Sequence, residues 1–133
     1  MNYEIKYMDF GGGDKMMCFV FEEENGVLGV FINGDAREFY LTIIEQIDKV
    51  LSGKKKQIES FGNECSWLIR PDFTFIRDNY ALDESCCEMA VATGELRALV
   101  EKIKNAVEEA KNTQKFQSRS ISNISRPTRR LLR

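Results

Sequence analysis

The side chains of this 133-residue chain that could take part in chemistry are thiols and carboxylates, because the chain contains no histidine. The lack of imidazole excludes Ser-His-Asp and Cys-His catalysis, histidine proton shuttles and histidine-ligated zinc sites. Four cysteines are present, and no two of them form a Cys-x-x-Cys pair: Cys18, Cys65, Cys86 and Cys87. A zinc ribbon or a thioredoxin-type site is therefore poorly supported.

The adjacent residues Cys86 and Cys87 leave two interpretations open. They could form a redox or metal site, but a thiol nucleophile would lack the histidine base that usually activates it. The favoured interpretation is that both pack as small apolar side chains on a strand. The first six residues show no basic segment followed by an apolar one, so we expect a cytoplasmic protein with reduced thiols.

The carboxylates occur in runs at expected turns and not in the pattern of an acid–base pair. One run, Glu22 to Glu24, directly precedes Asn25-Gly26, and another is Asp83-Glu84. General acid–base catalysis needs carboxylates that a cleft holds in two different environments. We therefore predict no catalytic residue, no metal ligand and no cofactor, and we expect that the protein is not an enzyme.

The net charge of −2 conceals an uneven distribution along the chain. Residues 1–116 hold 14 Lys and Arg against 21 Asp and Glu, a balance of −7, whereas residues 117–133 hold five arginines and no acid. The acidic body argues against direct nucleic-acid binding by the folded domain and favours attraction to a basic partner. The tail could be a disordered basic arm, a cloning remnant or a helix that a neighbour stabilises.

The first third of the chain reads as three strands followed by a helix. Alternation from residue 3, a glycine-rich turn at 11–14 and an apolar run at 16–21 predict a hairpin. Asn25-Gly26 then predicts a tight turn into a third strand, Val27 to Ile32. Asp35 is expected to cap a helix over Ala36 to Ser52, whose end Gly53 marks.

The remaining two thirds read as strands and a second helix. Strands are expected over Lys56 to Phe61, Cys65 to Arg70, Phe73 to Arg77 and Cys86 to Ala92, with Thr93 opening the helix. The order predicts an α+β, two-layer fold: an antiparallel sheet of about six to seven strands with two helices packed on one face. We expect one domain over 1–116 and a basic tail over 117–133, and no run is apolar enough to cross a membrane.

Four aromatic side chains of the second half allow two interpretations: Phe61, Trp67, Phe73 and Phe75. Such residues can form a stacking platform for RNA bases on a sheet. Their flanks carry few basic residues apart from Arg70 and Arg77, so we favour packing in the core beneath the helices.

One part of the chain resembles a known group of proteins. An amphipathic helix from Ile43 to Gly53 ends in Val-Leu-Ser-Gly, Ser60 to Glu64 (Ser-Phe-Gly-Asn-Glu) then leads into a strand, and Pro71-Asp72 precedes another. This pattern, which covers residues 36–78, resembles the immunity proteins of bacterial toxin systems, in particular those of contact-dependent growth inhibition.

The resemblance implies that the protein neutralises a cognate toxin, often a basic nuclease acting on tRNA, by covering its active site or blocking its substrate. Carboxylates can mimic phosphates and accelerate association with a basic partner, so exposed acids at loop ends are the expected contacts. These are Glu22, Glu23, Glu24, Asp72, Asp78, Asp83 and Glu84. Two alternatives stay open: a nucleic-acid-associated protein that uses its Arg-rich arm, and a thiol-based regulator that uses Cys86 and Cys87.

Overall fold

The computed structural model describes residues 2–9, 13, 15–82 and 87–131, with side chains as far as residue 112. The chain forms an α+β fold, as predicted. Its strands, however, belong to two antiparallel sheets and not to one. β1 (Tyr3–Asp9) pairs with β2 (Lys15–Phe21), and β3 (Ile58–Phe61), β4 (Cys65–Ile69), β5 (Phe73–Asp78) and β6 (Glu88–Ala92) form a meander in that order.

The prediction of a third strand at Val27–Ile32 is wrong, because this segment is helical. A 3-10 turn (Glu23–Asn25) leads into α1 (Gly26–Phe31), a π-helical turn (Ile32–Ala36) and α2 (Arg37–Leu51). Its buried residues follow helical spacing: Val27, Leu28, Phe31, Ile32, Ala36, Tyr40, Ile43, Ile47 and Val50. This long apolar stripe outweighs the turn preference of Asn25-Gly26. Because a helix takes the place of the third strand, the first two strands form a sheet of their own.

Asp35 does not cap a helix, contrary to the prediction, because the helical segment has already begun at Gly26. Its side chain is buried and instead accepts hydrogen bonds from the turn between β3 and β4. Gly53 has φ +84°, so the predicted left-handed end of α2 is confirmed.

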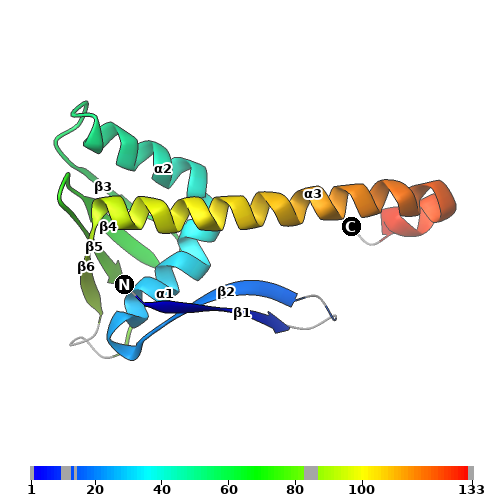
Figure 1. The fold of residues 1–133 in the computed structure, drawn as a ribbon, viewed down its shortest axis with the longest axis horizontal. Coiled ribbons are helices and arrows are strands. Elements are labelled where there is room, and N and C mark those ends of the chain that lie inside the picture. The colour runs from blue at the N-terminus through cyan, green and yellow to red at the C-terminus, as the bar shows by residue number, and fades with distance from the viewer. Residues whose placement is uncertain (1, 10–12, 14, 83–86, 132–133) are drawn as a thin grey trace.

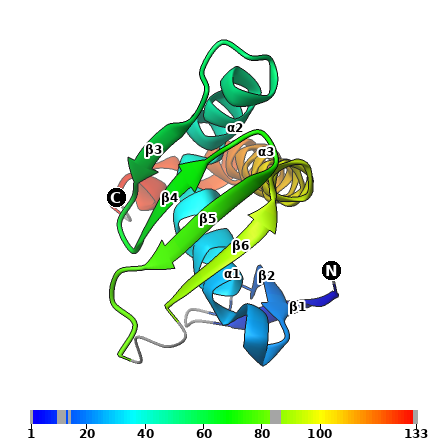
Figure 2. The same ribbon diagram turned by 90° about the vertical axis from the view of Figure 1, so that its left-hand side faces the viewer.

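The layers are visible from two sides. Figure 1 shows the four-stranded sheet at the left with α1 and α2 as a bent pair beside it, and α3 (Thr93–Leu131) running between α2 and the β1–β2 hairpin. Figure 2 looks onto the sheet, and all three helices lie behind it. The predicted packing of helices on one face therefore holds for the four-stranded sheet.

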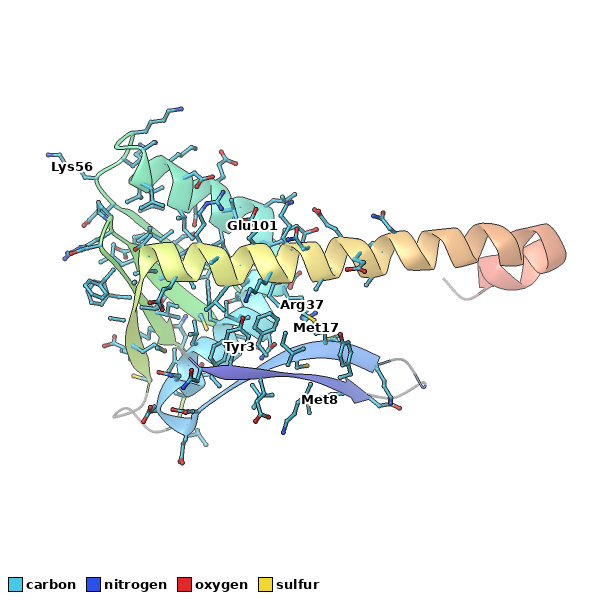
Figure 3. All side chains as sticks on the ribbon, viewed as in Figure 1. Tyr3, Met8, Met17, Arg37, Lys56 and Glu101 are labelled. Atoms are coloured by element: carbon cyan, nitrogen blue, oxygen red, sulfur yellow. The ribbon has the colours of Figure 1, made fainter. Side chains whose placement is uncertain are left out.

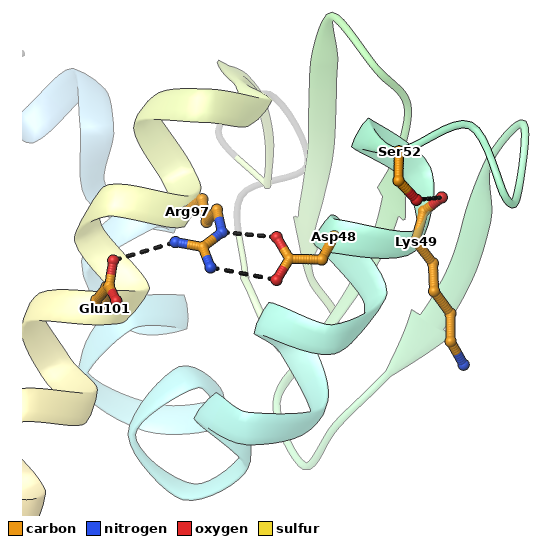
Figure 4. A network of polar contacts seen from close by, with 5 residues as sticks. All are labelled: Asp48, Lys49, Ser52, Arg97 and Glu101. Atoms are coloured by element: carbon orange, nitrogen blue, oxygen red, sulfur yellow. Dashed lines mark hydrogen bonds and ion pairs between the residues drawn. The ribbon is translucent and has the colours of Figure 1, made fainter.

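Helices α2 and α3 are held together by apolar side chains and by one ion-pair network. The buried apolar residues of α3 are Leu96, Leu99, Val100 and Ile103, at helical spacing. Near the start of α3, Arg97 donates from Nε to Asp48 Oδ1 at 2.7 Å and from Nη2 to Asp48 Oδ2 at 3.2 Å, and it also contacts Glu101 (Figure 4). This fork pairs the two helices across the layer.

Helix α3 continues past residue 116, where we expected the folded domain to end. Its backbone is helical as far as Leu131. The division of the chain at residue 116 stays a prediction. None of the helices in the described part of the chain combines the length and the apolar composition that crossing a bilayer requires.

Candidate binding surface

The acids predicted to bind a partner do not gather at one place. Glu22, Glu23 and Glu24 are exposed around the start of the helical segment. Acidic side chains are stabilising there, because the first turn of a helix presents unpaired N–H groups. Part of this run therefore has a structural explanation.

Two other predicted acids lie at opposite ends of β5, where each carboxylate accepts a hydrogen bond from a backbone N–H at the adjoining turn. Asp72 Oδ1 accepts the N–H of Phe73 at 2.8 Å, and Asp78 Oδ1 accepts the N–H of Tyr80 at 3.0 Å. They lie six positions apart along extended backbone, roughly 20 Å. The predicted Asp83 and Glu84 lie outside the described residues.

The surface that stands out is the uncovered side of the four-stranded sheet, which we call the open sheet face. The strand register places two rows of side chains across it. The first row is Phe61, Ser66, Arg77 and Glu88, and the second is Glu59, Leu68, Phe75 and Ala90. Beside the second row, Phe73 lies next to Arg70 at the turn. The helices cover only the opposite face, which leaves these side chains toward solvent (Figure 2).

The open sheet face carries more exposed aromatic surface than a solvated sheet usually does. Phe61 is 79% exposed, Phe73 47% and Phe75 44%. Large apolar side chains that gather on one face mark interaction sites more often than single ones do. The prediction that these three phenylalanines pack beneath the helices is therefore wrong.

Trp67 behaves as predicted, because it points to the opposite side of β4 and is buried. Its ring meets Phe31 edge-on at 5.1 Å, and its indole N–H donates to Gln46 Oε1 at 3.0 Å. Alternation along the strands therefore divides the four aromatic residues between the core and the surface.

A shallow groove of about 550 Å³ crosses the middle of the open sheet face. Leu68, Phe75 and Ala90 line its apolar part, and Arg77 and Glu88 line one side, joined by an ion pair of 2.8 Å. The Arg70 guanidinium lies 5.8 Å from the centre of the Phe75 ring. An apolar centre with charged groups at its margin is the arrangement of many protein–protein contact surfaces.

An acidic hollow of about 500 Å³ lies at the Asp78 end of β5. Its lining includes Glu64, Asp78 and Tyr80. Burial, followed by the negative charges of Asp35, Asp78 and Glu64, raises the pKa of the nearby Cys65 thiol to about 12. The hydrogen bond from Ser66 Oγ to Asn79 Oδ1, at 3.2 Å, connects this hollow to the first row of the open sheet face.

The described residues provide little for metal or thiol chemistry. No group of three or more His, Cys, Asp or Glu side chains suited to a metal ion occurs among them. Cys18, Cys65 and Cys87 are buried, so the expectation that Cys87 packs in the interior is confirmed, although it lies one residue before β6 (Glu88–Ala92) and not on a strand. Cys86 lies outside the described residues.

Comparisons with known proteins do not assign the chain to a family: no family model, curated protein or solved structure matches it. The resemblance to immunity proteins stays a prediction. Function is therefore argued from the open sheet face and from the charge of the body.

Sequence reasoning weighed Phe61, Phe73 and Phe75 as an exposed platform but favoured core packing, and so it did not predict the open sheet face. The signal was present, because Phe73 and Phe75 alternate with Thr74 and Ile76. Both sets are largely apolar, so alternation alone could not tell which set the helices cover.

Proposed function

We propose that this chain is an immunity protein that binds a basic toxin and neutralises it without chemistry of its own, using the open sheet face as its contact surface. The observation that carries the proposal is the uncovered sheet face, which holds three exposed phenylalanines and an apolar groove lined by one of them, Phe75. Residues of this kind dominate binding energy at protein interfaces when a partner removes them from water.

The groove supplies the affinity in this proposal. Phe75 and Leu68 lie at its centre and are flanked by Ala90, so an apolar side chain of the toxin can settle between them. The Arg77–Glu88 pair lies at the margin, where each charge can exchange its present partner for one on the toxin.

In this proposal, the negative charge of residues 1–116 accelerates association with a basic partner and favours such a partner over nucleic acid. Residues 1–116 carry a balance of −7, and Glu64 and Asp78 add local negative potential beside the groove. A basic partner is drawn toward such a surface, and its rate of association falls as salt is added. The same charge disfavours nucleic acid as the ligand of this face, because phosphates would meet carboxylates.

An immunity gene is expected beside its toxin gene, so the test is to titrate the purified full-length chain with the purified products of the adjacent genes and, separately, with single-stranded RNA. We expect the protein to bind with an association rate that falls with salt. The substitution Phe75→Ser should weaken this binding at least tenfold, since aromatic hot spots contribute about 2 kcal/mol or more.

The matched control is Leu41→Ser, because Leu41 is 59% exposed but lies on α2, behind the sheet. It removes a comparable apolar surface from the other side of the layer and should leave affinity unchanged. Equal weakening by both variants, or RNA binding that depends on Phe75 with no protein bound, would overturn the proposal.

A further inference from the structure

The two outer edges of the β1–β2 hairpin differ in whether other parts of the molecule form hydrogen bonds with them. The edge of β2 is covered, because the Asn33 side chain accepts the Phe19 N–H at 2.8 Å and donates to the Phe19 carbonyl at 2.7 Å. The Arg37 guanidinium donates to the carbonyl of Met17, two residues away. Side chains of the helical segment thus take the place of a neighbouring strand along β2.

These contacts reveal which backbone groups the edge of β1 presents. The N–H and C=O of Phe19 point away from β1, so its cross-strand pair with Ile5 is a non-hydrogen-bonded pair. The N–H and C=O of Ile5 must then point away from β2, and by alternation so must those of Tyr3 and Tyr7. Among the described residues, no backbone or side-chain group bonds to the main chain of these three on that side.

The edge of β1 also carries exposed apolar side chains. Ile5 is 47% exposed and Tyr7 66%, on the face that Tyr3 shares. Tyr3 stacks on Phe19 with ring centres 5.1 Å apart, and Figure 3 shows it pointing toward the helices. A seven-residue edge strand with exposed apolar side chains is a template for another strand.

We propose that a second copy of this chain pairs with this edge, β1 against β1, antiparallel and with Ile5 opposite Ile5. The residues with outward-pointing backbone groups then face one another: Ile5 meets Ile5, and Tyr3 meets Tyr7 of the second copy. Three such pairs allow six backbone hydrogen bonds. The two hairpins become one four-stranded sheet, and Tyr7 of each copy extends the Tyr3–Phe19 aromatic stack of the other.

Charge complementarity selects this register. With Ile5 at the centre, Glu4 of each copy lies opposite Lys6 of the other, which forms two opposite-charge pairs. Moving the centre to Lys6 pairs four outward-pointing residues of each copy instead of three, but it places Lys6 opposite Lys6 and Glu4 opposite Met8. Both opposite-charge pairs are then lost, and like charges directly opposite are destabilising. In the single chain, Glu4 and Lys6 form only an exposed contact of 3.8 Å. The proposal does not depend on the proposed function, because the open sheet face lies on another part of the molecule.

The experiment measures the mass of the full-length chain by sedimentation equilibrium over a concentration series. We expect a reversible dimer. Ile5→Pro breaks no hydrogen bond within the hairpin, because the Ile5 N–H points outward, and it should abolish the dimer while circular dichroism reports that the fold is retained. A chain that remains monomeric at the highest soluble concentration would overturn the proposal.

Charge exchange tests the register itself. Glu4→Lys alone turns two opposite-charge pairs into two like-charge pairs and should weaken the dimer about tenfold, as should Lys6→Glu. The double variant E4K/K6E restores opposite charges across the interface and should restore the dimer. A dimer that is insensitive to Ile5→Pro, or single variants that the double variant does not rescue, would refute this pairing.

Discussion

Replacing Asp35 by asparagine should destabilise the protein strongly, although the two side chains have nearly the same shape. Asp35 is only 1% exposed, and its two carboxylate oxygens accept hydrogen bonds from three consecutive backbone N–H groups. The shortest are 2.8 Å from Asn63 to Oδ1 and 2.7 Å from Cys65 to Oδ2. The amide would present an NH₂ group to at least one of these donors.

The size of the effect follows from the number of bonds. A buried N–H left unpaired costs about 1–3 kcal/mol, and a hydrogen bond to a charged acceptor contributes about 1.5–3 kcal/mol. Asp35→Asn should therefore lower the free energy of unfolding by on the order of 3 kcal/mol. With a urea dependence of about 1–3 kcal/mol per molar, the unfolding midpoint should fall by roughly 1–3 M.

The assay is urea unfolding followed by circular dichroism, with Asp72→Asn as the matched control. Asp72 is exposed and accepts one N–H, from Phe73 at 2.8 Å, which an asparagine oxygen can accept equally well. The control should change the free energy of unfolding by less than about 0.5 kcal/mol. An Asp35→Asn protein within that same margin of the parent would refute the reasoning.

Three further predictions concern single sites. Gly62→Ala should lower the free energy of unfolding in urea by about 2 kcal/mol or more, because its Cβ would lie 2.5 Å from Asp35 Cγ. The control Gly94→Ala adds a Cβ in open space and should be neutral or stabilising, so equal effects of the two variants would contradict the contact. The Arg97 guanidinium lowers the pKa of Asp48, so this exposed pair stabilises fully above about pH 4 and is lost as the pH falls through the folded pKa. In thermal unfolding, Asp48→Asn should therefore be less stable than the parent by under about 1 kcal/mol at neutral pH, and equally stable in acid. A difference in stability that does not change with pH would count against the pair. Burial and the neighbouring acids raise the pKa of Cys65 to about 12, so mass-spectrometric mapping should find Cys65 unalkylated at neutral pH until urea unfolds the chain; fast native labelling would disprove its burial.

Local patterns predicted much of the second half of the chain. Strand alternation and turn residues located β3, β4 and β5 to within about two residues, and helical spacing located α2 and the start of α3. Gly53 marked the end of α2 correctly, because a positive φ is a local requirement that only a few residue types meet.

The errors occurred where local signals compete. Asn25-Gly26 is a strong turn signal, and six apolar or small residues after it are compatible with a strand or a helix. The outcome depended on how that segment joins the helix that follows, with Leu28, Phe31 and Ile32 fully buried against other elements. Such tertiary packing is not visible in a short window of sequence.

The candidate binding surface was harder to predict than the fold. Exposed acids at turns are easy to identify, but Asp72 and Asp78 form hydrogen bonds within their own turns. The open sheet face depends on which side of β5 the helices cover, and Phe75 and Ile76 are about equally apolar. Only the three-dimensional arrangement separates them.

Growth protection tests the central claim most directly: that the chain neutralises a basic toxin through the open sheet face. Cells would express the toxin identified by the binding test together with the parent chain, Phe75→Ser or Leu41→Ser at matched protein levels. We predict growth with the parent and with Leu41→Ser, and arrest with Phe75→Ser. Equal protection by all three chains would contradict the contact surface, and arrest with the parent chain would contradict the immunity function.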